Sequence, residues 1–228
     1  MGADDGGLLA RWTGPLGPAA EPAGRELLDR WAEPHRHHHD RRHLTEVLDA
    51  VDELTGGDPP TAVVLAAWFH DAVYEGRAGE DERASAALAA RVLPALAPAL
   101  VDEVVRLVLL TASHRPEPGD DAGALLCDAD LSVLAAPPER YASYVQGVRQ
   151  EYAHVGDAAF RSGRAQVLRA LLGGPLFHTP AAADRWEARA RAQVAAEVQR
   201  LTGPDGGAEP RPAEAQRHGV PARQDRRR

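Results

Sequence analysis

The stretch Thr61–Tyr74, TAVVLAAWFHDAVY, runs a nearly unbroken apolar segment directly into a histidine and an aspartate. The segment is apolar on every side of a helix, so it predicts a helix over 60–74 that lies buried at the centre of the fold. His70 and Asp71 would then leave the end of a buried helix. An ionised carboxylate in such a place needs a cation beside it, and no arginine precedes Asp71 within a helical turn. A metal ion would meet that need most simply.

Proline and glycine punctuate the sequence on both sides of this segment and divide it into further helices. Apolar residues recur at steps of three and four, and only 5% of the residues are aromatic. These patterns predict an all-α fold, a single-domain helical bundle with a metal site between its central helices. We expect Trp31, Trp68 and Phe69 in the core. The expected helices cover residues 24–33, 36–54, 60–74, 80–93, 98–113, 121–135, 138–155, 157–172 and 180–201.

The chain length of 228 residues suits one domain, which we expect to span residues 11–202. Residues 1–10 and 203–228 are rich in glycine, proline and charge and contain few large apolar residues. Such segments bury too little apolar surface to offset the entropy of ordering them. We therefore expect both ends to be disordered.

The charge and the cysteine count restrict the partners and the compartment. A net charge of -8 argues against a nucleic-acid polymer, but not against a small phosphorylated substrate, because a bound metal supplies local positive charge. The single cysteine, Cys127, has no partner for an internal disulfide, which fits a reducing cytoplasm. The first residues lack the pattern of a signal peptide, and no apolar stretch approaches the roughly 18 residues of a membrane span. We expect a soluble cytoplasmic protein without a membrane partner, and the choice between monomer and homodimer stays open.

The tract Ala32–Leu44, AEPHRHHHDRRHL, holds five of the ten histidines. If the tract is helical, His39 and His43 lie four residues apart and share one face. Consecutive helical side chains point about 100° apart, so at most one or two members of the tract can face a given site. We expect the remaining histidines to be solvated: His35, His37 and His38.

A second buried helix carries acidic side chains in the segment LLCDADLSVL. Asp128 and Asp130 lie two residues apart and so face different sides of the helix, and we favour Asp130 over Asp128 as the residue that reaches the site. Two imidazoles, from His43 and His70, and the carboxylates of Asp71 and Asp130 would form a mixed nitrogen and oxygen set. Such a set suits Mn, Mg, Fe, Co or Ni with open positions better than a closed tetrahedral zinc site.

The order of a histidine, a His-Asp pair and an aspartate on separate helices resembles the HD-domain superfamily of metal-dependent phosphohydrolases. HHDRRHL is similar to the YHNxxHA motif of cyclic-nucleotide phosphodiesterases, and CDADLSVL is similar to their CADLSNP. From Trp31 to Thr179 the chain looks closer to a small bacterial family of predicted metal-dependent HD-superfamily phosphohydrolases. It departs from that pattern at His38, where a tyrosine is usual, and at Asp40, where an asparagine is usual. The blocks that mirror the family read EPHRHHHDRRH, WFHDAVY, EDERASA, DADLSVL, VRQEY and FRSGRAQVL.

The resemblance implies an HD-type bundle that binds one or two divalent metal ions per chain. In it the metal ligands are His43, His70, Asp71 and Asp130, and His39 protonates the leaving oxygen. Further candidates for water-orienting, catalytic roles are Glu75 and Glu82, and for substrate binding His114, Arg149 and Arg164. Several of these residues have structural alternatives. Glu82 and His114 can cap helices, and the arginines can form a buried ion-pair network with neighbours such as Glu151, Tyr152 and Arg161.

The sequence thus favours a metal-dependent phosphohydrolase that uses metal-activated water on a nucleotide or another small phosphate. One alternative is an HD-type di-iron oxygenase, because the same helical scaffold and His-Asp ligands can hold two irons. Another alternative is a non-catalytic helical module that binds a ligand.

Overall fold

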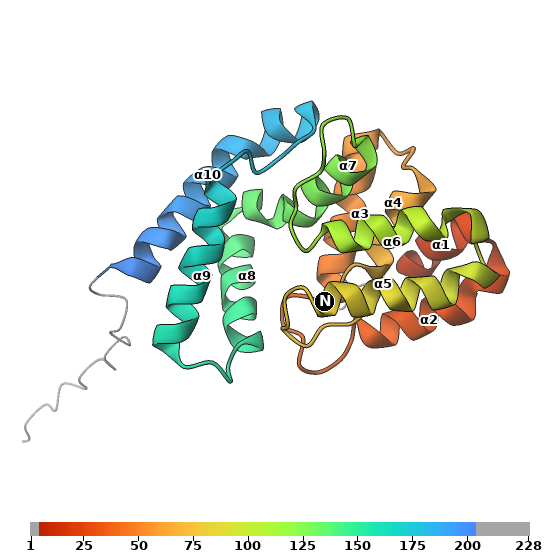
Figure 1. Ribbon diagram of the computed structural model, residues 1–228, viewed down its shortest axis with the longest axis horizontal. Helices are drawn as coiled ribbons and strands as arrows, with labels where there is room; N and C mark the ends of the chain where they lie inside the picture. Colours follow the sequence, from red (N-terminus) through yellow and green to blue (C-terminus); the bar gives the residue numbers. More distant parts are fainter. Residues whose placement is uncertain (1–4, 204–228) are drawn as a thin grey trace, which may run out of the picture.

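The computed structural model describes residues 5–203, and within them the chain is all-α without strands, so the predicted fold class is confirmed. Short 3₁₀ turns supplement the α-helices at residues 18–20, 93–95, 98–100 and 131–135. The α-helices (Figure 1) are α1 (Asp5–Leu16), α2 (Glu21–Arg30), α3 (Arg41–Thr55), α4 (Thr61–Phe69), α5 (Asp81–Val92), α6 (Val101–Leu110), α7 (Asp121–Asp130), α8 (Pro138–Glu151), α9 (Asp157–Leu172) and α10 (Pro180–Thr202).

The helices form two lobes, each with its own group of buried apolar side chains. Helices α1 to α7 form the first lobe, and the 3₁₀ turn Leu131–Ala135 with helices α8 to α10 forms the second. Figure 1 shows α8, α9 and α10 together on the side opposite α1, α2 and α5. Leu54 and Trp186 pack against both groups and so connect the two lobes.

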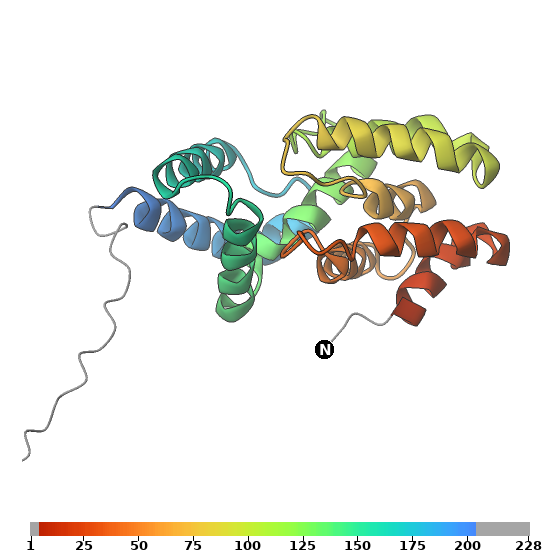
Figure 2. The ribbon, with the colours of Figure 1, turned by 90° about the horizontal axis from the view of Figure 1, so that it is seen from below.

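Helix α4 lies at the centre of the first lobe. It packs against α1, α3, α5, α6 and α7, and Figure 2 shows it between the layer of α5 and α6 and the layer of α1, α2 and α3. Every residue from Val63 to Phe69 is buried. The prediction of a buried central helix is confirmed, and Trp31, Trp68 and Phe69 are in the core as expected.

The predicted helix over 60–74 is too long at its C-terminal end, because α4 ends at Phe69. The buried guanidinium of Arg36 donates from Nη1 to the carbonyl oxygen of Asp71 at 2.7 Å and from Nη2 to that of Ala72 at 3.4 Å. A side chain thus satisfies carbonyl groups that follow the helix end. The chain can therefore leave the helix immediately after His70.

The predicted helix over 36–54 begins too early, because α3 starts only at Arg41. Asp40 is its N-cap and accepts hydrogen bonds on Oδ1 from the backbone N–H of Arg42 at 2.9 Å and of His43 at 3.2 Å. Such a cap satisfies backbone donors that have no partner inside the helix. The histidines before Asp40 therefore lie in a loop. The expectation that His39 and His43 share one face of a helix is wrong, because His39 precedes α3.

The expectation of disorder over residues 1–10 is wrong for residues 5–10, which belong to α1. Leu8 and Trp12 are buried, and the Trp12 ring lies 5.2 Å from that of Trp68 and 5.9 Å from that of Phe69. Leu8 and Trp12 are four residues apart, so both lie on the face of α1 that covers α4. The burial of this face stabilises the helix more than the neighbouring glycines destabilise it. Residues 1–4 and all of the expected C-terminal tail except Gly203 lie outside the described residues.

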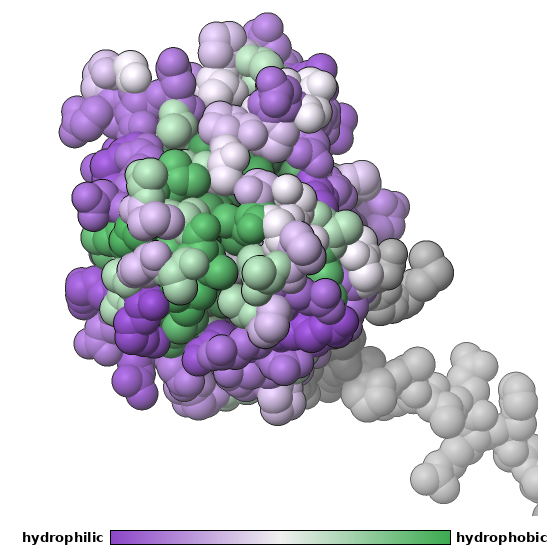
Figure 3. Space-filling model, turned by 90° about the vertical axis from the view of Figure 1, so that its right-hand side faces the viewer, coloured by the Kyte–Doolittle hydropathy of each residue, from purple (hydrophilic) through white to green (hydrophobic). Residues whose placement is uncertain are grey.

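The connection from α5 to α6 carries an apolar surface at one end of the first lobe. Figure 3 looks onto this end of the molecule and shows apolar residues gathered near its middle. Among residues 5–203, no helix combines the length and apolar character needed to cross a membrane. Partly buried side chains at this end that pack against the core are Val92, Leu96, Ala97, Leu100 and Val101.

Leu8 tests whether α1 belongs to the folded core. Its side chain is 3% exposed, so we expect Leu8→Ala to lower the free energy of unfolding by about 2–5 kcal/mol. Leu109 is 42% exposed, so the same truncation there, Leu109→Ala, should stay within about 0.5 kcal/mol of wild type. Urea unfolding followed by circular dichroism measures both. Equal, small effects would show that α1 does not contribute to the core.

Candidate metal centre

Four of the predicted site residues meet at one point between the helices. His43 comes from α3, His70 and Asp71 from the end of α4, and Asp130 from the end of α7. His43 Nε2 lies 3.3 Å from His70 Nε2 and 3.0 Å from Asp130 Oδ1. His70 Nε2 lies 3.2 Å from Asp71 Oδ2 and 3.5 Å from Asp130 Oδ1. Ligand atoms of His43, His70 and Asp71 all lie within 4.8 Å of one another, a spacing that could hold a metal ion.

The ring of His70 is oriented for ligation. Its Nδ1 lies 2.8 Å from the carbonyl oxygen of Ala67, to which it donates. This bond leaves the lone pair of the neutral ring on Nε2, the atom that faces His43 and the two carboxylates. Two imidazole nitrogens this close, facing two carboxylates, require a proton or a cation among them. The donor set of two nitrogens and two carboxylates fits a divalent ion with open coordination positions.

The two carboxylates depend on imidazoles rather than arginine for positive charge. The side chains of Asp71 and Asp130 are 16% and 13% exposed, and no arginine of residues 5–203 forms an ion pair with either. Burial raises the pKa of both carboxyl groups, but the neighbouring His70 imidazole outweighs it and holds both pKa values below the usual range. Conversely, burial lowers the pKa of His70, but Asp71 and Asp130 outweigh it and raise that pKa well above its usual value. The cluster therefore attracts a positive charge, as a proton or as a metal ion.

Asp128 has a structural role that differs from the position of Asp130 in the cluster. Its two carboxylate oxygens accept hydrogen bonds from the backbone N–H of His178 and of Thr179, each at 2.7 Å. Thr179 is the N-cap of α10, so Asp128 fixes the chain where this last helix begins. Only Asp130 reaches the cluster, in agreement with the preference for it on sequence grounds.

His114 extends the cluster from the loop after α6. Its Nε2 lies 2.8 Å from Asp130 Oδ2, and its carbonyl oxygen lies 3.1 Å from His178 Nε2. His114 has a φ of 50°, the only positive value among the non-glycine residues that the structure describes. Such a conformation is costly for a residue with a Cβ and is retained where the surroundings require it. His114 is therefore a partner of Asp130 and not a solvated helix cap.

The loop before α3 is organised by one carboxylate, that of Glu151 at the end of α8. Glu151 Oε1 accepts hydrogen bonds from the backbone N–H of His37 at 2.8 Å, of His38 at 2.7 Å and of His39 at 2.9 Å. Successive N–H groups that converge on one oxygen form an anion-binding nest. Burial raises the pKa of Glu151, but the hydrogen bond and charge of the His39 ring, followed by the backbone N–H groups of His38 and His39, outweigh it and lower that pKa to about 2.

The ring of His39 is fixed on both sides. Its Nδ1 lies 2.8 Å from Glu151 Oε2, and the ring stacks on Tyr74 with centroids 4.1 Å apart. Tyr74 also donates its hydroxyl to Glu151 Oε2 at 3.1 Å. Burial lowers the pKa of His39, but the bond to Glu151 and the charge of Asp71 outweigh it and raise that pKa above its usual value. His39 thus faces the site although it does not lie on α3.

His38 is buried, which corrects the expectation that it is solvated, whereas His35 and His37 are exposed. The nest around Glu151 turns the His38 ring inward against the rings of His43 and Tyr144, both with centroids 4.6 Å away. Burial lowers the pKa of His38 well below its usual value.

A cavity of about 570 Å³ opens between the lobes beside the cluster. Asp71, Asp130, His39 and His114 line it together with residues of α8 and α9. This volume lies within the range of roughly 300–1,000 Å³ usual for small-molecule sites.

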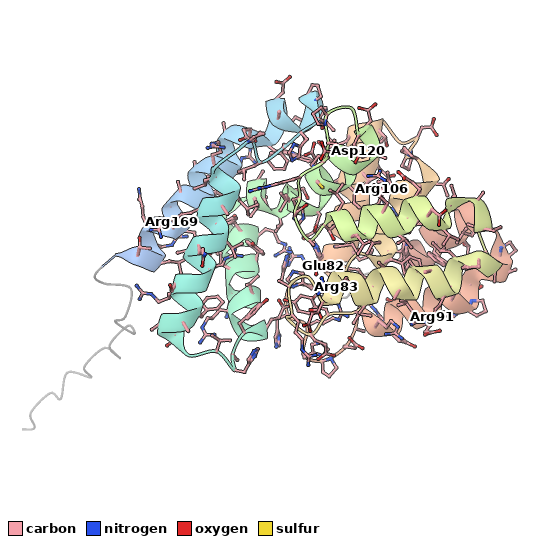
Figure 4. The ribbon with its side chains drawn as sticks, in the orientation of Figure 1. Glu82, Arg83, Arg91, Arg106, Asp120 and Arg169 are labelled. Atoms are coloured by element: carbon pink, nitrogen blue, oxygen red, sulfur yellow. The ribbon has the colours of Figure 1, made fainter. Side chains whose placement is uncertain are left out.

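The remaining candidates fall into two groups. Glu82 and Arg164 line the cavity, and Figure 4 shows Glu82 at the start of α5, on the side that faces α8 and α9. Glu82 accepts the N–H of Gly79 at 2.5 Å, in the loop that precedes α5. The Arg164 guanidinium donates to the buried Glu197 at 2.9 Å and to the hydroxyl of Tyr144 at 2.5 Å.

Two candidates lie outside the cavity lining. Glu75 is exposed, and its backbone N–H donates to Asp81. Arg149 pairs with Asp157 and donates to carbonyl oxygens of the loop between α8 and α9. The substrate-binding role expected for Arg149 and the water-orienting role expected for Glu75 therefore find no support in their positions.

Sequence reasoning assigned no role to Tyr74 and gave Glu151 only a place in an ion-pair network, although together they fix His39. The one available signal was hidden, because the expected helix over 138–155 placed Glu151 inside the helix. Helix α8 in fact ends at Glu151, where the helix dipole disfavours negative charge. A residue that contradicts this local preference points to a distant partner.

Comparison of the chain with protein-family models, with curated proteins and with solved structures finds no match. Any functional assignment therefore rests on the motifs of the sequence and on the geometry of the cluster and its cavity.

An isosteric pair of substitutions separates the two aspartates of α7. We expect Asp130→Asn to weaken metal binding by about 100-fold or more, because the neutral amide replaces a charged oxygen beside His43 and His70. Asp128→Asn should retain the metal and lower the free energy of unfolding by about 1–3 kcal/mol, because one backbone N–H loses its acceptor. Elemental analysis after dialysis and urea unfolding measure the two quantities. Metal loss in Asp128→Asn alone would contradict the arrangement.

Glu151 makes the stability depend on pH. Because its pKa falls from an ordinary value of 4.5 to about 2 on folding, its contribution is complete above about pH 4.5 and is lost as the pH falls towards 2. We expect Glu151→Gln to cost roughly 1–3 kcal/mol at pH 7, because an amide cannot accept all five hydrogen bonds that the Glu151 carboxylate accepts. The difference from wild type should shrink as the pH falls through this window in urea unfolding. A difference that is constant with pH would rule out the ionised nest.

Proposed function

We propose that this chain is a metal-dependent phosphohydrolase that cleaves a phosphoester bond of a small molecule, by the action of metal-activated water. The observation that carries the proposal is the arginine-free cluster of His43, His70, Asp71 and Asp130, whose two carboxylates line a cavity of ligand size. The resemblance of the His, His-Asp and Asp motifs to the HD-domain superfamily points to the same chemistry.

These four residues would hold the metal. A divalent ion bound there supplies a water of lowered pKa and positive charge for the phosphoryl oxygens. Mn, Mg, Fe, Co and Ni all accept the mixed set of imidazole and carboxylate ligands. His114, through its 2.8 Å contact with Asp130 Oδ2, limits the directions in which that carboxylate can turn.

His39 is the group placed to give a proton to the leaving oxygen. Its Nδ1 is held by Glu151, so Nε2 is the ring nitrogen that remains for the substrate. The raised pKa of His39 favours the protonated form of the ring, which is the form that a general acid requires. The stacking on Tyr74 holds the ring in one orientation.

Arginine contributes little to binding the phosphoryl group. Arg77 and Arg164 are the arginines in the described lining of the cavity, and Arg164 is already paired with Glu197. The negative charge of the phosphoryl group is therefore met mainly by the metal centre and by His39. This arrangement suits a substrate with one phosphoryl group.

A second candidate function is a di-iron oxygenase on the same scaffold. It is favoured by one observation, the position of His114 beside Asp130, which adds a third imidazole to the cluster. Two metal ions per chain, both iron, together with oxygen consumption would distinguish it from the phosphohydrolase.

The proposal is tested by metal content and turnover in Asp71→Ala, with Glu75→Ala as the matched control outside the cavity. We expect Asp71→Ala to lose bound metal and to lower the hydrolysis of para-nitrophenyl phosphate by more than about 100-fold, because it removes a ligand. Glu75→Ala should retain both, because Glu75 is exposed.

Elemental analysis and release of nitrophenol with added Mn or Mg measure the two outcomes. Unchanged metal content in Asp71→Ala would overturn the metal centre. Metal loss in a chain whose wild type hydrolyses no phosphoester would leave the non-catalytic binding module as the better account.

A further inference from the structure

Helix α9 carries apolar side chains on two faces. Ala165 and Leu168 are buried, on a helix that packs along α10, while Phe160, Val167 and Leu171 line the cavity beside the metal centre. Val167 is 55% exposed, one of two large apolar side chains in the described residues that are open to solvent. A helix with a second apolar face has a partner for that face or lines a binding site.

Helix α8 supplies the facing wall. Tyr144, Val148 and Tyr152 follow one another at steps of four residues, which places them on one side of the helix and its end, and all three line the same cavity. The rings of Tyr152 and Phe160 lie 6.1 Å apart and bring the two walls together. We call the six residues Tyr144, Val148, Tyr152, Phe160, Val167 and Leu171 the apolar subsite.

Gly163 keeps space open in this wall. It lies in the middle of α9 and lines the cavity, and a Cβ built on it meets no atom within 4 Å. In contrast, a Cβ on the helical Gly24 would meet Trp12 at 2.4 Å, and one on Gly147 would meet the His37 carbonyl oxygen at 2.7 Å. Packing explains those two glycines but not Gly163. A side chain introduced at Gly163 therefore meets no atom of the protein near its Cβ and can extend into the cavity that this residue lines.

The charges around the cavity limit what that ligand carries. The carboxylates that line it are those of Asp71, Asp81, Glu82 and Asp130, and Arg164 is paired with Glu197. In the described lining only Arg77 remains as an arginine for a second phosphoryl group. An organic group without charge is therefore the better match for the part of the cavity that the apolar subsite lines.

We propose that the apolar subsite binds the organic group of a phosphomonoester, and that this group is apolar and aromatic. The inference rests on the proposed function for the position of the phosphoryl group at His39 and the metal centre. In the reaction, water adds its oxygen to phosphorus, the bond from phosphorus to the aryl oxygen breaks, and that oxygen takes a proton. The product alcohol retains the part that the subsite recognises, so the alcohol alone also binds there.

The probe is 1-naphthol, titrated calorimetrically into the full chain. Gly163→Trp fills the subsite from the wall, and Ser162→Trp places the same side chain on the exposed neighbouring position, about 100° around the helix. We expect Gly163→Trp to weaken naphthol binding by about tenfold or more, and Ser162→Trp to leave it unchanged. Wild type that binds no naphthol, or equal binding by both variants, would overturn the proposal.

A second pair of variants tests naphthol binding with substitutions at exposed positions, which should leave the fold intact. Val167 and Leu109 are the two exposed large apolar residues, and only Val167 lines the cavity. Val167→Asp should weaken naphthol binding several-fold, whereas Leu109→Asp should not change it, and both should unfold at the wild-type temperature. Unchanged binding in Val167→Asp would also overturn the proposal.

Turnover separates this inference from the proposed function. With 1-naphthyl phosphate as substrate, Gly163→Trp should raise KM, while kcat/KM for glycerol 3-phosphate should stay within about twofold of wild type. If no ester is hydrolysed but Gly163→Trp still abolishes naphthol binding, the proposed function fails and the apolar subsite stands. If both esters are hydrolysed equally well by wild type and Gly163→Trp, the subsite fails and the proposed function stands.

Discussion

The partial burial of Asp71 and Asp130 without an arginine is the constraint on which the rest of the structure depends. A buried carboxylate is stable only beside positive charge, and here that charge comes from imidazoles or a metal ion. The ligands must therefore converge from separate helices. The largely apolar helix α4 brings two ligands, His70 and Asp71, to this point. Because α4 is buried from Val63 to Phe69, the polar residues that follow it must find partners inside the protein. Arg36 makes that ending stable by binding the carbonyl groups of the residues after His70.

The second constraint is the carboxylate of Glu151, which joins the lobes. It lies at the end of α8 in the second lobe and binds three backbone N–H groups and one ring nitrogen of the loop before α3 in the first. A buried, multiply bonded carboxylate holds a fixed geometry better than apolar contacts alone, because its partners must all stay in place. The width of the cavity between the lobes and the direction of His39 therefore depend on the same side chain.

The fold class and the position of His70 and Asp71 at the end of a buried helix could be predicted from local patterns, whereas the choice of His43 and Asp130 to complete the cluster depended mainly on the resemblance to the HD-domain superfamily. The apolar segment before His70 dictates burial, and burial of acidic residues dictates their need for positive charge. The start of α3 could not be predicted in this way. The loop before it is held by Glu151, 112 residues away from His39, and no local propensity reports such a contact. Residues two apart face different sides of a helix. Asp130 faces the cluster and Asp128 faces the start of α10, which agrees with the preference for Asp130.

The orientation of His39 depends on several contacts that act together. Asp40 caps α3 directly after it, a role that asparagine and aspartate fill about equally well. The His38 ring is buried, which lowers its pKa well below the usual value, and it packs against both Tyr144 and His39 with centroids 4.6 Å away. Glu151 and Tyr74 hold the His39 ring as well, by a hydrogen bond and by stacking. The direction of the His39 ring therefore follows from α8, from the segment after α4 and from its own loop, because each of them contributes a separate contact.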